Sequence, residues 1–298
     1  MAIRRVDPAG ARHESLIAAR RAVVTMDTRR PPGDRHQGPR REQIWPGGTV
    51  PLAQELTDTG RAWNTFASAD PLWAIYVRRE AKRGGWDEAA FYATGAAEIE
   101  AVLSRARQLG LQTSGQSALD FGCGAGRLTR PLASHFELVT GVDVAPGMLE
   151  LAQRDNPVRG RCRFLLNTRP DLAMFGTGEF DLVYSSIVLQ HISPGLTRAY
   201  LPEFARVLRP GGSLIVHLPT HPRWTMRGFV YRFLPQSALG LIQRRLLGYA
   251  APMRMHGMAE AEVRALLAAH GVEVVATASV AYCPDWYELR YFCRRHRS

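Results

Sequence analysis

The chain has 298 residues, 46% of them hydrophobic, which is enough for one large α/β domain with additions or for two small domains. No stretch approaches the roughly 18 uninterrupted apolar residues that a membrane-spanning helix needs. The four cysteines form no C-x-x-C pair and have no partnered histidine spacing, which disfavours a metal site and a disulfide framework. This cysteine usage is typical of a reducing cytoplasm.

The formal net charge of +11 is unevenly distributed along the chain. Residues 1–50 carry ten arginines and five acids, and residues 288–298 carry four arginines and one acid. Residues 219–258 hold six arginines and no acid, so the remaining body is slightly acidic. A nucleic-acid enzyme usually spreads its basic charge around the active site. The distribution therefore disfavours a nucleic-acid partner.

The first predicted region, residues 1–48, is an Arg-rich tail without apolar periodicity, and we expect it to be disordered. Residues 49–115 are predicted to be a helical cap. One helix is indicated near 61–68, a second follows Asp70 and Pro71 and runs to Ala81, and a longer one is capped near Asp87 and ended by Gly110.

Seven aromatic residues gather between Trp63 and Tyr92. One interpretation is a small core that joins the cap helices to the rest of the chain. The other is a cap that lines a substrate pocket, for which Tyr92 is the first candidate.

After Ser114, apolar strands and amphipathic helices alternate, which is typical of a parallel sheet covered on both faces. The predicted strands and helices are strands 117–121, 137–142, 161–166, 180–184 and 212–218, and helices 127–135, 146–155 and 195–208. The cationic, apolar insertion at 219–258 precedes a last helix at 259–270. Two final strands, 272–280 and 287–294, are expected to pair antiparallel.

The segment Ala118–Gly126 reads as a buried strand that turns through three glycines into a helix. Glycine is needed where the backbone takes positive φ or approaches a ligand closely. Asp143 ends the next strand about 20 residues later, the spacing at which a carboxylate receives a ribose diol. These features predict a site for an adenosine-containing cofactor. Arg127 stands where a dinucleotide fingerprint has its third glycine, which disfavours NAD.

Asp120 followed by Gly122-x-Gly124-x-Gly126 resembles motif I of the class I S-adenosylmethionine-dependent methyltransferases. Phe180–His191 and Leu201–His217 are similar to the fourth-strand and fifth-strand blocks of that family, in the same order. The resemblance covers roughly residues 117–295. It implies a Rossmann-like, seven-stranded, mostly parallel sheet with helices on both faces. Residues 116–298 would then be the S-adenosylmethionine-binding domain, with 219–258 as a lid.

The resemblance also implies a set of cofactor-binding residues: Asp120, Gly122, Cys123, Gly124, Gly126, Arg127, Asp143, Asn167, Tyr184 and Ser185. Asp143 would accept both ribose hydroxyls, although an acid at this place can also cap the next helix. Asp120 would orient the loop and reach the amino end of the cofactor through water. Arg127 would pair with the methionine carboxylate or cap the helix surface. Asn167 stands where the family often places an Asp on the adenine amine.

Methyl transfer needs a general base only if the acceptor must lose a proton first. His191 is the first candidate, because histidine titrates near neutrality, although this position is often structural in related sequences. His256 is a second candidate on the substrate side. The lid composition fits an anionic or amphipathic acceptor. The alternatives are a lid that packs on the domain with solvated arginines, or one that touches a membrane surface.

We therefore predict a cytoplasmic S-adenosylmethionine-dependent methyltransferase that acts on a hydroxyl, or an amine, of a small molecule and uses no metal. The alternatives are an RNA or protein methyltransferase and a non-catalytic homologue that binds only the cofactor.

Overall fold

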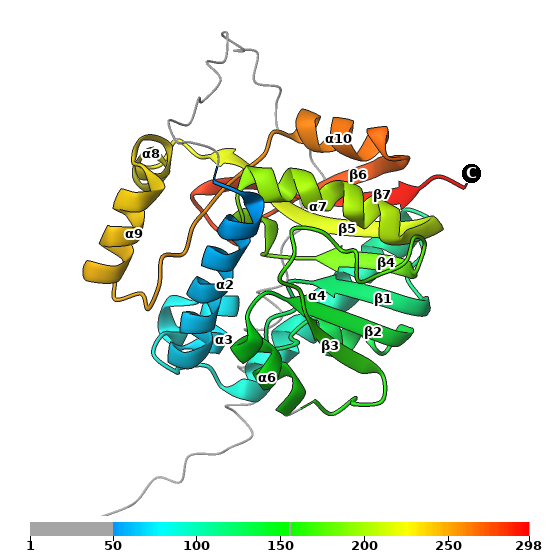
Figure 1. The fold of residues 1–298 in the computed structure, drawn as a ribbon, viewed down its shortest axis with the longest axis horizontal. Coiled ribbons are helices and arrows are strands. Elements are labelled where there is room, and N and C mark those ends of the chain that lie inside the picture. The colour runs from blue at the N-terminus through cyan, green and yellow to red at the C-terminus, as the bar shows by residue number, and fades with distance from the viewer. Residues whose placement is uncertain (1–49, 155, 298) are drawn as a thin grey trace, which may run out of the picture.

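The computed structural model describes residues 50–154 and 156–297, so the predicted tail at 1–48 lies outside the described residues. A seven-stranded sheet in the order β3-β2-β1-β4-β5-β7-β6 forms its centre (Figure 1). The strands are β1 (Gly115–Phe121), β2 (Phe136–Asp143), β3 (Cys162–Leu166), β4 (Phe180–Ser185), β5 (Leu208–Pro222), β6 (Val272–Val280) and β7 (Trp286–Arg295). The first five strands pair in parallel, and β7 pairs antiparallel with both β5 and β6. The predicted fold class is confirmed.

Helices cover both faces of the sheet. They are α2 (Leu52–Ala69), α3 (Pro71–Ile75), η1 (Arg79–Ala81), α4 (Glu88–Gln108), α5 (Thr129–Leu132), α6 (Pro146–Arg154), η2 (Leu189–His191), α7 (Pro194–Val207), α8 (Met226–Phe233), α9 (Gln236–Arg245) and α10 (Glu260–Ala269). Alternate strand residues serve two cores: Val183 packs with α7 and α10, whereas its neighbours Leu182 and Tyr184 pack with α4, α5 and α6. Figure 1 accordingly shows α7 in front of the sheet and α4 behind it.

Several boundaries differ from the predicted ones. The helix expected at 127–135 is only the single turn α5, because the glycine turn occupies the residues before it and 3₁₀-type bonds close the chain after it. The strand expected at 212–218 extends over Leu208–Pro222, because Leu208 pairs with Phe180 of β4 and the antiparallel partner β7 continues the ladder to Pro222. Asp70 occupies the N-cap position of α3 and Pro71 its first turn, as predicted, but the Asp70 carboxylate accepts the Arg83 N–H and makes no capping bond. The helix α3 ends at Ile75, well before Ala81.

The cap region and the insertion meet in a small third core. Phe66, Trp73, Met148 and Ala251 are buried there, and the rings of Trp73 and Tyr249 meet edge to face with centroids 4.9 Å apart. Phe66 and Trp73 therefore belong to a structural core, whereas Trp63 lines the pocket, so each interpretation of the aromatic residues holds for some of them. Asp87 caps α4 as predicted, since its carboxylate accepts the Ala90 N–H at 2.8 Å.

Within the insertion, α8 and α9 lie at the left of Figure 1, away from the sheet. Thr225 caps α8 by accepting the Gly228 N–H at 2.9 Å. In the part of the chain that the structure describes, no helix is both long and apolar enough to cross a membrane.

Candidate functional site: a glycine turn facing a carboxylate

A pocket opens at the carboxyl ends of β1, β2 and β4, the edge at which doubly wound sheets bind ligands. The glycine turn after β1 forms one wall. Gly122, Gly124 and Gly126 have φ values of 75°, 53° and 80°, a region that residues with a Cβ rarely adopt. A Cβ on Gly124 would lie 2.9 Å from the side chain of Ile75. About 830 Å³ of empty space lies within the pocket and its open mouth, open solvent included.

Asp143 lies opposite this turn and lines the pocket. One carboxylate oxygen accepts the Gly124 N–H and the other accepts the Ala145 N–H, both at 2.9 Å. Burial raises the pKa of Asp143, and these N–H donors oppose the shift. Each oxygen keeps a lone pair for a second donor. Asp143 therefore holds the turn before α6 and does not cap the helix itself, because the Ala145 carbonyl accepts the first helical N–H groups. Its two oxygens remain available as acceptors for a diol.

Asp120 lies behind the glycine turn rather than in the pocket wall. It is buried and accepts the Thr129 hydroxyl at 2.6 Å. Burial raises its pKa to about 7, although the Thr129 hydrogen bond and the Arg127 charge oppose that shift. In this position Asp120 can orient the glycine turn, which is one of the two roles predicted for it.

Arg127 lines the pocket, but its guanidinium is not on the helix surface, so the surface-capping alternative is wrong. Nη2 pairs with Glu98 at 3.0 Å, and the guanidinium lies over the Tyr76 ring, 4.8 Å from its centroid. Nε is buried and has no hydrogen-bond partner among the described residues. A buried donor without a partner at a pocket wall fits an anionic ligand group.

Glu98, on α4, is the centre of a buried ionic cluster that the sequence analysis missed. It accepts hydrogen bonds from Tyr184 at 3.0 Å and Ser186 at 2.7 Å, and it pairs with Arg127 and with Arg290 at 2.8 Å. Burial alone would raise the pKa of Glu98, but the two guanidinium groups and the hydroxyl donors lower it to about 2.

Tyr184 and Ser185 do not line the pocket, contrary to the sequence-based expectation. Tyr184 faces Glu98, and Ser185 donates to the Phe121 carbonyl at 3.0 Å on the neighbouring strand. The pocket floor consists of the next residues, Ser186, Ile187 and Val188. The predicted strand end is therefore the right one, but the side chains of Tyr184 and Ser185 point to Glu98 and to the Phe121 carbonyl instead of into the pocket.

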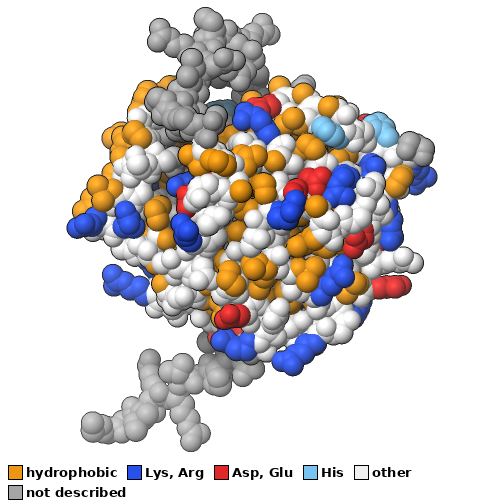
Figure 2. Space-filling model, viewed as in Figure 1, with side chains coloured by type: hydrophobic (Ala, Val, Ile, Leu, Met, Phe, Trp, Pro, Cys, Tyr) orange, Lys and Arg blue, Asp and Glu red, His pale blue; other side chains and the backbone are white. Residues whose placement is uncertain are grey.

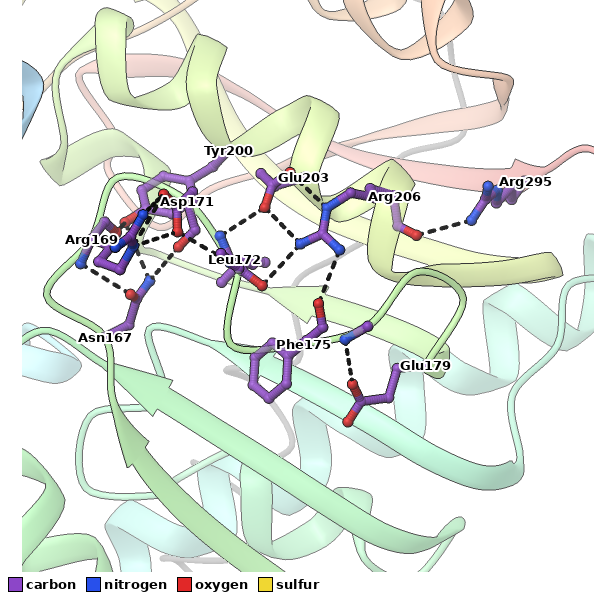
Figure 3. Close-up of polar contacts among 12 residues, drawn as sticks. Asn167, Arg169, Asp171, Leu172, Phe175, Glu179, Tyr200, Glu203, Arg206 and Arg295 are labelled. Carbon is purple, nitrogen blue, oxygen red and sulfur yellow. Dashed lines mark hydrogen bonds and ion pairs between the residues drawn. The ribbon is translucent and has the colours of Figure 1, made fainter.

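Asn167 lines the pocket, but its amide is already occupied within the β3–β4 loop (Figure 3). Its oxygen accepts the Arg169 N–H at 3.1 Å, and its nitrogen donates to the Asp171 carbonyl at 3.1 Å and to the Tyr200 hydroxyl. The side chain thus shapes the pocket rim, and one oxygen lone pair is left for an adenine amine.

The same loop is tied to α7 by Arg206 (Figure 3). Its guanidinium donates to the Leu172 and Phe175 carbonyls, both at 2.9 Å, and pairs with Glu203 at 2.8 Å. Glu203 in turn accepts the Leu172 N–H at 2.8 Å. The loop at this side of the pocket is therefore held in one conformation by charge-assisted bonds.

His191 lines the pocket, and the Trp63 ring meets it edge-on at 5.2 Å. Because the Arg254 carbonyl can only accept, Nδ1 donates to it at 2.7 Å, and Nε2 accepts the Gln190 amide at 3.1 Å. Burial lowers the pKa of His191 to about 4. His256 does not line the pocket; burial likewise lowers its pKa to about 4. Both rings are therefore neutral near pH 7.

The pocket wall contributed by the cap consists of Leu56, Thr59, Trp63 and Ile75. Tyr92, the residue predicted to line the pocket, instead lies behind the glycine turn, where its hydroxyl donates to the Ala125 carbonyl at 3.2 Å. A signal for Glu98 was present in the sequence, because it falls at helical spacing between Gly95 and Val102 on the apolar stripe of α4.

Comparison with known families identifies this core. A family model described as a methyltransferase domain matches residues 118–212, from β1 through the start of β5. Residues 118–212 therefore carry a methyltransferase domain, and the seven-stranded sheet has the fold of the class I S-adenosylmethionine-dependent methyltransferases. The methyltransferase domain resembles the demethylmenaquinone methyltransferase of Tropheryma whipplei, with 35% identity over 127 residues, 41% of this chain and 49% of that protein. It also resembles a ubiquinone biosynthesis O-methyltransferase of Cereibacter sphaeroides, with 34% identity over 119 residues, 40% of this chain and 47% of that protein.

The matched segments span about half the length of these curated relatives. Among solved structures, the magnesium protoporphyrin IX methyltransferase of Synechocystis PCC 6803 shares the fold with a TM-score of 0.55 and 22% identity, over 81% of this chain and 99% of that one. That structure contains bound S-adenosylhomocysteine.

Proposed function

We propose that the protein is an S-adenosylmethionine-dependent methyltransferase that methylates a hydroxyl, or an amine, of a small anionic or amphipathic molecule. The observation that carries the proposal is the Asp143 carboxylate, which lines the pocket and is held by the backbone N–H groups of Gly124, in the glycine turn, and of Ala145. Two relatives are named as a demethylmenaquinone methyltransferase and a ubiquinone biosynthesis O-methyltransferase, which supports a small-molecule acceptor.

The residues of the pocket fit this cofactor. Asp143 offers two oxygens to the ribose diol. The buried Arg127 Nε–H has no partner in the described part of the chain, so it suits the methionine carboxylate of the cofactor. When bound, S-adenosylmethionine supplies an electrophilic methyl group on a sulfonium. The protein contributes orientation, since holding the acceptor at near-attack distance can account for much of the acceleration.

His191 is proposed to orient the acceptor at the pocket wall, not to remove a proton from a poorly acidic hydroxyl. A base with a pKa of about 4 stays neutral at pH 7 but takes up a proton only weakly. The Arg254 carbonyl fixes the tautomer, so the single lone pair of Nε2 accepts a hydrogen bond from the Gln190 amide. An acceptor hydroxyl that takes the place of this amide would donate to the same lone pair.

The test of the cofactor assignment is Asp143→Ala. We expect calorimetry to show S-adenosylmethionine binding weakened by about 1.5–3 kcal/mol, roughly 10-fold to 150-fold in Kd, because hydrogen bonds to a charged acceptor are lost. Asp58→Ala, which removes an exposed carboxylate on α2, is the matched control and should leave Kd unchanged. Unchanged affinity of Asp143→Ala, in a variant that still melts cooperatively, would refute the assignment. A screen with labelled methyl groups then separates an enzyme from a homologue that only binds the cofactor.

The two buried histidines give a second prediction. We expect NMR titration to show that the His191 and His256 rings stay neutral down to about pH 5, with the first of these signals absent in His191→Gln. The unfolded chain takes up these protons near pH 6.5 and the folded chain only near 4, so folding stability should fall as the pH decreases through that interval. A His191 signal that titrates near 6.5 would contradict the buried neutral tautomer.

A further inference from the structure

The insertion exposes large apolar side chains that the methyltransferase pocket does not use. On and just before α8 these are Trp224, Met226, Phe229 and Phe233, and on and after α9 they are Leu241, Leu246 and Leu247. We call these seven residues the lid patch. Met226 is 86% exposed, Leu246 77% and Trp224 68%. Neighbouring exposed apolar side chains on this scale mark an interaction surface.

Three aromatic members of the lid patch, Trp224, Phe229 and Phe233, form a continuous row. The rings of Trp224 and Phe229 have centroids 5.2 Å apart, and those of Phe229 and Phe233 are stacked at 5.8 Å. The Arg232 guanidinium lies over the Trp224 ring at 4.3 Å. The rings therefore stabilise one another while one side of the row stays exposed.

Positive charge surrounds this row. The segment 219–258 contains six arginines and no acidic residue, and Arg227, Arg244 and Arg245 are exposed. Figure 2 shows hydrophobic and basic side chains together along the left edge, where Figure 1 places α8 and α9. Tryptophan, phenylalanine and leucine beside arginine on short surface helices are the composition of an element that lies in a membrane interface.

The positive charge around the lid patch also decides which partner can bind there. A second copy would bring an identical arginine-rich patch, and residues 1–50 of this chain carry a net positive charge, so both would be repelled. An anionic lipid bilayer can bury the rings at the boundary of headgroups and acyl chains, and its negative headgroups attract the arginines. We propose that the lid patch docks the protein on anionic lipid bilayers.

The lid is firmly connected to the pocket. Gln243 exchanges two hydrogen bonds with the Met253 backbone, at 2.8 and 2.9 Å, which holds α9 against the returning chain. That chain reaches the pocket wall, where the Arg254 carbonyl accepts from His191 and the His256 N–H donates to the Gln190 carbonyl at 2.7 Å. Docking through the lid patch thus brings the pocket wall close to the bilayer surface, where an amphipathic acceptor would be concentrated.

The experiment is liposome co-sedimentation of the full chain. Vesicles of phosphatidylcholine with 30% phosphatidylglycerol are compared with pure phosphatidylcholine, for the unaltered protein and for a triple variant, Trp224→Ser, Met226→Ser and Phe233→Ser. Met174→Ser, an exposed apolar residue outside the lid patch, is the matched control. The substituted side chains are exposed, so the melting temperature should be unchanged in all variants.

We expect the unaltered protein and Met174→Ser to bind the anionic vesicles at least about tenfold more strongly than the neutral ones, and the triple variant to lose at least about tenfold. Raising the NaCl concentration to about 1 M should weaken binding, because the Debye length falls to about 3 Å. The Trp224 fluorescence should shift to the blue on binding, a change absent in Trp224→Phe.

Equal sedimentation with both vesicle types, or equal sedimentation of the triple variant, would overturn the proposal. So would absence of vesicle binding together with a concentration-dependent dimer that the triple variant abolishes, since the lid patch would then be an interface between copies. Because the readout is binding without cofactor or acceptor, it does not depend on the proposed methyl transfer.

Discussion

Replacing Glu98 by alanine should lower the free energy of unfolding by about 3–5 kcal/mol, the cost of removing one partner from a buried ion pair. Glu98 compensates two guanidinium groups at once, Arg127 at 3.0 Å and Arg290 at 2.8 Å, and Arg290 is 1% exposed. Without the carboxylate, two positive charges would remain buried side by side. Glu98→Gln keeps a hydrogen-bond acceptor for Tyr184 and Ser186 but no charge, so it should still lose most of that stability.

Denaturant unfolding at pH 7 measures this effect, and Glu100→Ala is the matched control. Glu100 lies on the same helix, but its side chain is 65% exposed, so its ion pair with Arg107 should contribute less than about 1 kcal/mol. Similar losses for Glu98→Gln and Glu100→Ala would show that the buried cluster carries little stability.

The pH dependence gives an independent check. The folded pKa of Glu98, about 2, lies below its ordinary value of 4.5, so its contribution is complete above pH 4.5 and disappears as the pH falls toward 2. The unaltered protein should lose stability through that interval, and Glu98→Gln should not share this part of the loss.

Gly95→Ala should destabilise the fold by about 3 kcal/mol, at the upper end of what overpacking costs. Gly95 lies on α4 where the helix meets the glycine turn, and a Cβ there would lie 2.1 Å from the Arg127 carbonyl oxygen. The obstacle is backbone, so no side-chain rotation can relieve it. The gain of about 1 kcal/mol in helix propensity is smaller than this cost. Since Arg127 follows the turn directly, cofactor affinity should also fall, by at least about tenfold.

Thermal unfolding and calorimetry with S-adenosylmethionine test both parts. Gly160→Ala is the control, because a Cβ at Gly160 meets nothing within 4 Å. If Gly95→Ala kept both stability and affinity, the close packing of α4 on the turn would be wrong. Loss of stability alone would mean that α4 supports the fold without shaping the pocket.

The sequence determined the features that depend on local pattern. Three glycines directly after a buried strand allow the backbone to turn sharply with positive φ, and an acid at the end of the next parallel strand must reach the same sheet edge. The alternation of strands and helices likewise fixed the parallel sheet, because each apolar strand needs cover on both faces.

The tertiary structure decided the features that depend on distant partners. Arg290 and Glu288 were counted with a basic terminal segment, yet both are buried in β7, because β7 lies between β5 and β6 inside the sheet. The charge on an arginine is visible in a sequence, but its burial depends on a carboxylate 192 positions away in the chain, Glu98. In the same way, His191 has the residue type of a base, and only burial beside Trp63 in the folded protein keeps it neutral, although its hydrogen bond to the Arg254 carbonyl opposes that shift. Local periodicity sets backbone conformation, whereas burial and charge pairing arise only when separate segments meet.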